Sequence, residues 1–465
     1  MLEPNEKKAY ILALLKSLRH AGVKFLRFQA VDATNTVRAK AVPIDRLLEQ
    51  STAGNDDDDY DLDHQVAIAQ VVFGGLPSFG DYIQEASGLD ATRLVQLIPD
   101  MSTLRIPPYA PQSATVLCAL QDPITRQPSE LCCRTLLARV VHEAKAKHNI
   151  AFTVGSELEF CLLDAQTKQP IDETNFAQTR LLNENESFLT NLYDALTAQD
   201  IMVEQIHAES APGQVEVVLR YCHQPLEMAD RLTCARETIS SLARSSGMLA
   251  LWLPKVFATK AGNGTHLHLS IHDATTGASL FAATGDGTCN PLQRQSTDDI
   301  HPVGQSFMEG ILCQLPSLLA LTLPTTNSFR RVGPGCWTGS GCQWAFDDKE
   351  SPLRVAANHK SRVWNRVEYK LMDATANPYL AMAAILTAGL DGIARRVQLR
   401  PPNVSTDMSL QNLGDCLNAL EGNTLLMKEM SPKLVRAYLA CRRGEIEHAG
   451  DRTLEAEVSE AIRLS

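Results

Sequence analysis

The amino-acid sequence predicts an α+β protein with two domains, and three observations support this fold class. The chain has 465 residues, about three times the length of a typical domain. Stretches with the apolar period of a helix alternate with stretches that have the period of two of a strand, without a repeat of fixed length. Prolines interrupt residues 100–128, which indicates a domain boundary near residue 125. We therefore expect domains at residues 1–124 and 125–465.

The N-terminal elements are predicted from their periodicity. Residues 4–20 carry apolar side chains at helical spacing and stop before Gly22, which favours a helix. Residues 23–31 and 37–42 alternate between apolar and polar side chains and are joined by a polar turn, so we expect a β-hairpin. A further strand is expected at residues 115–120.

An acid-rich run between these elements has no apolar periodicity. Residues 51–63 include four consecutive aspartates, Asp56 to Asp59. Like charges in a row are typical of a solvated loop. A calcium site is the alternative, but a calcium loop needs alternating ligands and a turning glycine. The loop is therefore the preferred interpretation.

The larger C-terminal part alternates predicted helices and strands. A helical pattern begins beyond Ser129. Residues 225–247 begin with a proline and end with a glycine, as helices often do. Residues 377–389 begin with an asparagine followed by a proline, which is typical of an N-cap and the first turn of a helix.

Charge and composition exclude several classes of protein. The chain is 44% hydrophobic and 21% charged, as globular proteins are. Its net charge of −11 leaves no basic field for nucleic acid or anionic lipid, so neither partner is expected. The first residues lack the pattern of a secretory signal, and the most apolar windows, 312–323 and 379–390, are too short for a bilayer. Twelve cysteines without a C-x-x-C pair favour reduced thiols, and we expect a cytoplasmic protein.

Four strand-like segments place polar side chains at alternate positions, and therefore on one face. These side chains are Glu157 and Glu159; Glu216; His266, His268 and Ser270; and Arg366, Glu368 and Lys370. One such segment alone is better explained as the exposed face of a sheet. Together, and with Glu209 upstream of the second segment, they supply the oxygen and nitrogen donors that bind Mg²⁺ or Mn²⁺. Arginines beside such ions suit phosphoryl transfer.

The familiar nucleotide-binding loops do not occur in the sequence. There is no G-x-x-x-x-G-K-[ST] motif, and the glycine-rich residues 332–341 do not spell G-x-G-x-x-G. These glycines either allow tight turns or belong to a flap over a site, and the sequence leaves both interpretations open.

These segments resemble the glutamine synthetase family over nearly the whole chain. The resemblance implies a small β-grasp-like N-terminal domain and a large catalytic domain, whose antiparallel sheet forms a funnel-shaped barrel flanked by helices. It also implies ATP and two or more divalent cations, Mg²⁺ or Mn²⁺, as cofactors. One cation would be held by Glu159, Glu209 and Glu216, and the other by Glu157, His266 and Glu368.

The resemblance also assigns residues to the substrates. The nucleotide is expected to contact Tyr221, His268, Ser270, Arg354 and Arg366. The acid is expected to contact Arg331, Lys370 and Gly262. The residues expected to take part in the chemistry are Lys349, Arg354 and Trp337.

The chain departs from the family pattern around the amine. Members that use ammonia have a flap glutamate where this chain has Trp337, and their N-terminal aspartate loop is replaced at residues 73–78, which hold no aspartate. Two anionic partners for an ammonium ion are thus lost, whereas tryptophan offers an apolar surface and a cation–π face. The alternative is that Trp337 only packs the flap shut.

The sequence therefore predicts an ATP-dependent ligase that joins the γ-carboxylate of glutamate, or of a close analogue, to an amine through an acyl phosphate. One alternative is a glutamine synthetase proper, which uses ammonia. Another is a non-catalytic structural or regulatory member of the family, although the complete set of metal ligands argues against it. The resemblance also implies a homo-oligomer, a dodecamer of two stacked hexameric rings, with small molecules as the other partners.

Overall fold

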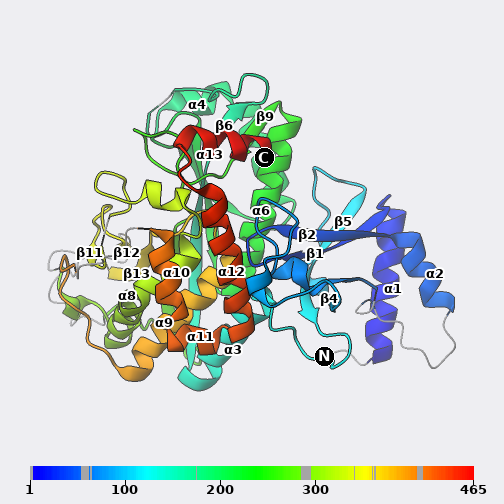
Figure 1. The fold of residues 1–465 in the computed structure, drawn as a ribbon, viewed down its shortest axis with the longest axis horizontal. Helices are drawn as coiled ribbons and strands as arrows, with labels where there is room; N and C mark the ends of the chain where they lie inside the picture. The colour runs from blue at the N-terminus through cyan, green and yellow to red at the C-terminus, as the bar shows by residue number, and fades with distance from the viewer. Residues whose placement is uncertain are drawn as a thin grey trace.

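A computed structural model describes most of the chain and contains two β-sheets with helices packed around them (Figure 1). The described residues are 4–53, 62, 65–173, 175–283, 295–339, 341–358, 360, 363–405 and 412–464. The loop expected at residues 51–63 is wrong at its start, because residues 51–53 belong to the helix Ile44–Ala53. Asp56 to Asp59 lie outside the described residues, so the loop expected there stays a prediction.

The first sheet is built from the N-terminal part of the chain and has five strands in the order β2-β1-β5-β4-β3. Its strands are β1 (Phe25–Val31), β2 (Val37–Pro43), β3 (Ala67–Ala69), β4 (Leu94–Pro99) and β5 (Ser113–Gln121). The predicted hairpin is confirmed, because β1 and β2 pair antiparallel, whereas β5 joins β1 in parallel. The predicted first helix is α1 (Pro4–His20), and α2 (Ile44–Ala53) packs against it. The β-grasp description of this part stays a prediction, as does the boundary at residue 125.

The second sheet has eight strands along the path β11-β12-β13-β10-β6-β8-β7, with β9 paired to β6. Its strands are β6 (Ile150–Asp164), β7 (Val203–Ala208), β8 (Gln214–Cys222), β9 (Met248–Leu251), β10 (Leu267–Asp273), β11 (Trp344–Phe346), β12 (Leu353–Asn358) and β13 (Val363–Tyr369). All four segments with alternating polar residues are confirmed as strands.

The structure supports the expected funnel-shaped barrel only in part. The sheet is a curled half-barrel, because within the described residues its end strands β11 and β7 do not pair and leave the path open. It is also not wholly antiparallel, because β11 pairs with β12 in parallel. Residues 347–352 carry the chain back before β12 begins, and Asp347 turns it with a φ of 48°.

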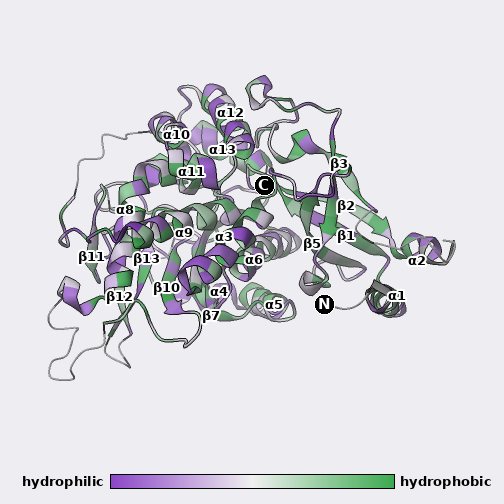
Figure 2. Ribbon diagram, turned by 90° about the horizontal axis from the view of Figure 1, so that it is seen from below, coloured by the Kyte–Doolittle hydropathy of each residue, from purple (hydrophilic) through white to green (hydrophobic). Residues whose placement is uncertain are grey.

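A layer of helices covers the apolar face of this sheet, in which α8 (Pro302–Thr322) and α3 (Cys133–His148) flank α9 (Pro378–Arg395), with α6 (Pro225–Ser245) beside them (Figure 2). Leu158, Leu267 and Val367 project from the strands into this contact and are buried. The remaining helices are α4 (Thr179–Glu184), α5 (Glu186–Thr197), α10 (Leu413–Glu421), α11 (Thr424–Glu429), α12 (Pro432–Ala449) and α13 (Leu454–Leu464). The polar face of the sheet is thus left for the candidate site.

The helix expected to end at Gly389 continues to Arg395. Gly389 lies against the ring of Phe307, and Gly392 lies against the backbone of α8, so that a Cβ at either position would collide with α8. The glycines therefore permit close packing of two helices and do not end one. The predicted start is confirmed, because the side chain of Asn377 accepts hydrogen bonds from the amides of Tyr379 and Leu380.

Two reciprocal hydrogen bonds join the N-terminal part to the start of α9. The Asn377 side chain donates to the carbonyl of Asp32 at 2.7 Å, and the Asn35 side chain donates to the carbonyl of Ala374 at 3.0 Å. Asn377 is buried, so this one side chain both caps the central helix and holds the hairpin loop.

The part of the chain that the structure describes has no helix with the length and apolarity to cross a membrane. Its cysteines are free thiols, and most of them are buried, as expected.

We predict that Asn377→Ala lowers the free energy of unfolding by about 2–4 kcal/mol, because it removes a cap and leaves a buried carbonyl without its donor. Asn412→Ala is a matched control, since Asn412 caps α10 from an exposed position by bonding to the amide of Asp415, and should cost only about 1 kcal/mol. Urea denaturation measures both. Equal losses would show that the bond to Asp32 contributes nothing.

Candidate active site

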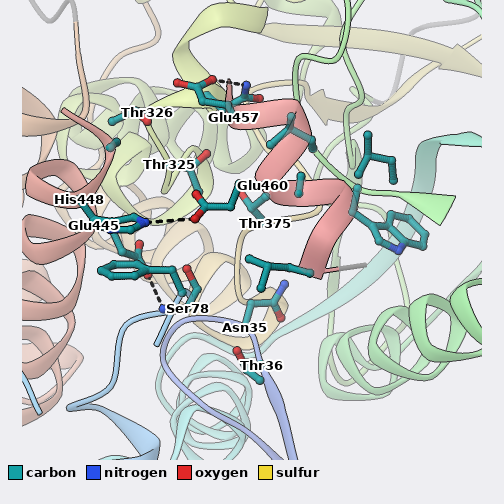
Figure 3. Close-up of a pocket in the computed structure, with 18 of the residues that line it drawn as sticks. Asn35, Thr36, Ser78, Thr325, Thr326, Thr375, Glu445, His448, Glu457 and Glu460 are labelled. Carbon is teal, nitrogen blue, oxygen red and sulfur yellow. Dashed lines mark hydrogen bonds and ion pairs between the residues drawn. The ribbon is translucent and has the colours of Figure 1, made fainter. Parts of the chain in front are cut away.

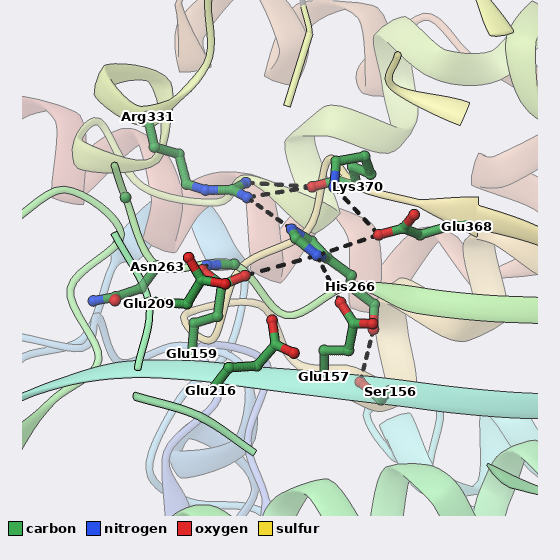
Figure 4. Close-up of polar contacts among 12 residues, drawn as sticks. Ser156, Glu157, Glu159, Glu209, Glu216, Asn263, His266, Arg331, Glu368 and Lys370 are labelled. Carbon is green, nitrogen blue, oxygen red and sulfur yellow. Dashed lines mark hydrogen bonds and ion pairs between the residues drawn. The ribbon is translucent and has the colours of Figure 1, made fainter. Parts of the chain in front are cut away.

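The predicted metal ligands lie together around one cavity on the polar face of the second sheet. The cavity has a volume of about 410 Å³, and all six predicted ligands line it. They come from different elements: Glu157 and Glu159 from β6, Glu216 from β8, Glu368 from β13, His266 just before β10, and Glu209 just after β7. Figure 4 shows their side chains converging.

Strand register explains why they meet. Glu159 lies opposite Glu216 in the antiparallel pair of β6 and β8, and His268 lies opposite Glu368 in the pair of β10 and β13. Facing residues in such pairs have side chains on the same side of the sheet. The period of two within each strand and the register between strands thus gather the acids on one face.

His266 is the centre of the cluster. Its Nδ1 lies 3.1 Å from Glu157 Oε2, 3.4 Å from Glu368 Oε1 and 3.7 Å from Glu159 Oε1. One imidazole is therefore within reach of three carboxylates. Glu159 also accepts from the amide of Gly264 at 2.8 Å, which fixes its orientation.

Two groups of side chains can each hold a metal ion. In the first group, Glu157, His268 and Glu368 offer atoms within 4.8 Å of one another, and in the second group His207, Glu209 and Glu216 do so. The pairing of Glu157 with Glu368 and of Glu209 with Glu216 matches the predicted division into two sites. His268, which was expected at the nucleotide, lies beside Glu157 at 2.9 Å.

Sequence reasoning missed His207. Its Nε2 lies 3.3 Å from Glu209 and 3.8 Å from Glu216. The signal was present in the sequence, because His207 and Glu209 are two residues apart, as are the paired residues of the other strands. Glu209 was predicted as a metal ligand but not as part of a strand, so the alternation was not extended to β7.

The charges in the cavity fit a divalent cation. Burial, followed by repulsion from Glu157 and Glu159, raises the pKa of Glu216 to about 10. Burial likewise raises the pKa of Glu159. Carboxylates crowded in this way retain protons unless another positive charge is present, and Mg²⁺ or Mn²⁺ prefers this set of oxygen and nitrogen donors. The residues therefore fit the expected metals.

Two acids of the cluster, Glu157 and Glu368, have pKa values that are lowered and not raised. Burial alone would raise the pKa of Glu368, but His268, Lys370 and His266 outweigh burial and lower it to about 2. Burial also opposes the charge of Glu157, yet hydrogen bonds with His266 and His268 hold its pKa well below the usual range. These two carboxylates are charged before any metal binds.

The residues expected to hold the acid substrate lie at one end of the cavity. Arg331 is buried, with a guanidinium nitrogen 3.4 Å from His266 Nε2, and within the described chain nothing accepts from its Nε. Lys370 donates to Glu368 at 3.2 Å. Gly262 lies against Arg331, where a Cβ would collide. Arg331 thus has one unused donor, Nε, in a site where only glycine fits beside it.

The residues expected at the nucleotide surround an adjoining cavity of about 540 Å³. Tyr221, His268, Ser270 and Arg366 line it, and Glu157 lines both cavities. Arg354, assigned to the same ligand, lines the first cavity instead and contacts Glu368 at 2.5 Å. The two cavities therefore meet at the cluster of acids, with Arg354 and Arg366 on either side.

Trp337 is half-exposed at the rim of the first cavity. Its side chain is 53% exposed, its backbone has a φ of 60°, and its amide donates to Glu350 at 3.0 Å. Phe176, 52% exposed, faces the same ammonium: Lys349 Nζ lies 5.9 Å from the centroid of the Phe176 ring and 6.0 Å from that of Trp337. Phe176 was missed because it belongs to a loop without periodicity.

The glycine-rich segment is a turn that borders the cavity. Gly335, Gly339 and Gly341 have φ values of 73°, 66° and 94°, which only glycine adopts readily. Cys336, Trp337 and Thr338 line the cavity. The turn interpretation is confirmed, and the position over the site is the one that a flap would have.

Residues 130–461 match the family described as glutamine synthetase, catalytic domain. The chain belongs to the glutamine synthetase family. It is 29% identical to type-1 glutamine synthetase 1 of Dictyostelium discoideum, over 95% of this chain and 89% of that protein. It is 28% identical to gamma-glutamylpolyamine synthetase GlnA3 of Streptomyces coelicolor, over 93% and 92% of the two chains. A crystal structure described as a novel glutamine synthase homolog is similar with a TM-score of 0.80 and 26% identity, over 95% of this chain and 99% of that one.

We predict that Glu159→Gln and Glu368→Gln each weaken Mn²⁺ binding and lower ATP turnover at least about 100-fold, because an amide is a poor ligand for a hard cation. The side chains keep their size, so the fold should survive. Mn²⁺ titration and ADP release measure the two effects. Glu227→Gln, on an exposed part of α6 paired with Arg231, is the control that should change neither. Normal Mn²⁺ affinity in both site variants would contradict the assignment of the ligands.

Proposed function

We propose that this protein is an ATP-dependent ligase that joins the γ-carboxylate of glutamate, or of a close analogue, to an amine other than ammonia. The observation that carries the proposal is a cavity lined by all six candidate metal ligands and by cationic side chains, whose rim is formed by two half-exposed aromatic rings, Phe176 and Trp337. The gamma-glutamylpolyamine synthetase among the relatives is consistent with an amine as the acceptor.

The acid would bind beside Arg331 and Lys370. No described residue accepts from Nε of Arg331, its two terminal nitrogens reach the Lys370 carbonyl only at 3.4 Å, and a guanidinium can bind a carboxylate. Lys370 adds a second positive charge from a buried position. The reacting carboxylate of the substrate would then point toward Glu159 and His266, which line the same cavity.

ATP would occupy the adjoining cavity, with its terminal phosphate at the junction near Glu157. An oxygen of the substrate carboxylate attacks the γ-phosphorus, ADP leaves, and an acyl phosphate forms. Arg354, Arg366 and Lys349 neutralise the charge that spreads over the transferring oxygens. Bound Mg²⁺ or Mn²⁺ would polarise these oxygens as a Lewis acid.

The amine then attacks the acyl carbon, and inorganic phosphate leaves while the nitrogen loses a proton. An amine that carries a hydrocarbon chain gains from contact with Phe176 and Trp337, at about 0.8 kcal/mol for each buried methylene. The high exposure of Trp337 favours this role over simple packing of the loop, because a ring that packs a loop is buried.

Glutamine synthetase proper is the second candidate, because relatives such as the Dictyostelium discoideum protein are named for that activity. The two candidates share every step up to the acyl phosphate. They differ only in the nucleophile, so the choice rests on the rim of the cavity.

We also propose, from the family resemblance, a cytoplasmic homo-oligomer of two stacked hexameric rings with a β-grasp-like N-terminal domain. Light scattering in solution measures the mass of the assembly, and a mass below that of twelve chains would contradict the proposed ring structure.

We predict that ammonia is a poorer acceptor than at least one alkyl, aryl or polyamine substrate. The comparison is of kcat/KM, with each amine corrected to its free-base concentration. A kcat/KM for ammonia that equals or exceeds the kcat/KM of every amine would establish glutamine synthetase proper, the second candidate, instead.

Substitutions of the two aromatic rings test whether the rings select the amine in the same measurement. Phe176→Ala and Trp337→Ala should each lower kcat/KM for the preferred amine about tenfold or more and change ammonia little, because only the amine has a chain to bury. Tyr193→Ala is a control on an exposed aromatic ring of α5. Equal losses for amine and ammonia would show that the rings do not select the acceptor.

A further inference from the structure

A third cavity lies between the N-terminal part and the C-terminal helices, and no residue of the candidate active site lines it. Its volume is about 500 Å³, and its walls come from α6, β9, α12 and α13 together with residues 35–37 and 78–79 (Figure 3). Cavities of this size hold small organic ligands in many proteins.

The acids on the α12 and α13 side of this cavity already have partners. The pairs are Glu457 with Arg330 at 3.0 Å, Glu460 with Arg452 at 2.5 Å, and Glu445 with Arg442 at 2.6 Å. His448 also lies 3.2 Å from Glu460, and the dashed line in Figure 3 marks this contact. These acids are therefore neutralised within the protein.

Three charged side chains on α6 have no such partner. Arg236 stacks over the ring of Trp252 at 5.4 Å, and its Nε is buried without an acceptor among the described residues. Burial lowers the pKa of this guanidinium, although Glu237 and Asp373 oppose the shift. A buried donor without an acceptor is unfavourable, so Arg236 can gain from an anionic ligand in this cavity.

Arg244 and Glu237 complete the set. Both line the same cavity, and across the described chain neither side chain has a hydrogen bond or an ion pair within 4.0 Å. Arg236, Ser240 and Arg244 follow one another at intervals of four residues, which places them along one side of α6. The α6 wall thus presents two guanidinium groups and one carboxylate that form no ion pair or side-chain hydrogen bond with the described residues.

We propose that this cavity is a binding site for a small amino dicarboxylic acid. Each guanidinium can bind one carboxylate of the ligand, and Glu237 can bind its ammonium group. The charges match one to one, two negative and one positive on the ligand against two positive and one negative on α6. A simple dicarboxylate leaves Glu237 unpaired next to an anion, so it should bind less well.

The test is calorimetric titration of the full-length protein with L-aspartate and with succinate. We expect saturable binding of L-aspartate that Arg236→Gln and Arg244→Gln each weaken about tenfold or more. Arg244 is exposed, so its variant should fold normally even if Arg236→Gln does not. Succinate should bind about tenfold more weakly than L-aspartate, and Glu237→Gln should remove this difference.

The control separates this cavity from the candidate active site. Lys370→Gln, in the first cavity, should leave the affinity for L-aspartate unchanged. Loss of binding in Lys370→Gln together with normal binding in both arginine variants would overturn the proposal, because the ligand would then occupy the active site. Absence of saturable binding, or succinate affinity equal to that of L-aspartate, would also overturn it. None of these outcomes depends on ligase activity.

Discussion

Repulsion between buried carboxylates is the constraint on which the rest of the structure depends. Five glutamates border one cavity, and their mutual repulsion would separate them in a flexible chain. The structure offsets this repulsion in two ways. His266, Lys370 and Arg354 lie within 3.4 Å of Glu368, and the strands that carry the acids are held in register by the hydrogen-bonded sheet. The charge that remains uncompensated is what makes the site suited to a divalent cation.

The helices supply the rigidity that this arrangement requires. The same alternation that turns the acids toward the cavity turns Leu158, Leu267 and Val367 toward α9 and its neighbours. The glycines of α9 let it lie directly against α8, so the layer beneath the sheet is thin and dense. The face of the sheet that carries the mutually repelling carboxylates is therefore supported by the opposite, apolar face, which packs closely on the helices. Both faces follow from the period of two in the sequence.

Local patterns in the sequence predicted the fold class and the four polar strands, because a period of two needs no knowledge of distant contacts. The six candidate metal ligands came from the family resemblance, and the structure places all six around one cavity. Features that depend on distant contacts were missed. The path of the sheet is open and β11 is parallel to β12, which no local pattern encodes. Gly389 was taken for a helix end because its contact with Phe307 joins residues 82 positions apart. Phe176 was overlooked because a loop residue has no periodic neighbours, whereas His207 could have been found from its spacing to Glu209.

The location of Phe176 and Trp337 has an evolutionary consequence. Both rings lie outside the strands, whereas four of the five glutamates and His268 lie on strands of the second sheet. Exchanging a loop side chain leaves the geometry of the sheet unchanged. A lineage built on this scaffold can therefore acquire a new nucleophile through a few substitutions in loops, while the machinery that activates the acid is inherited intact.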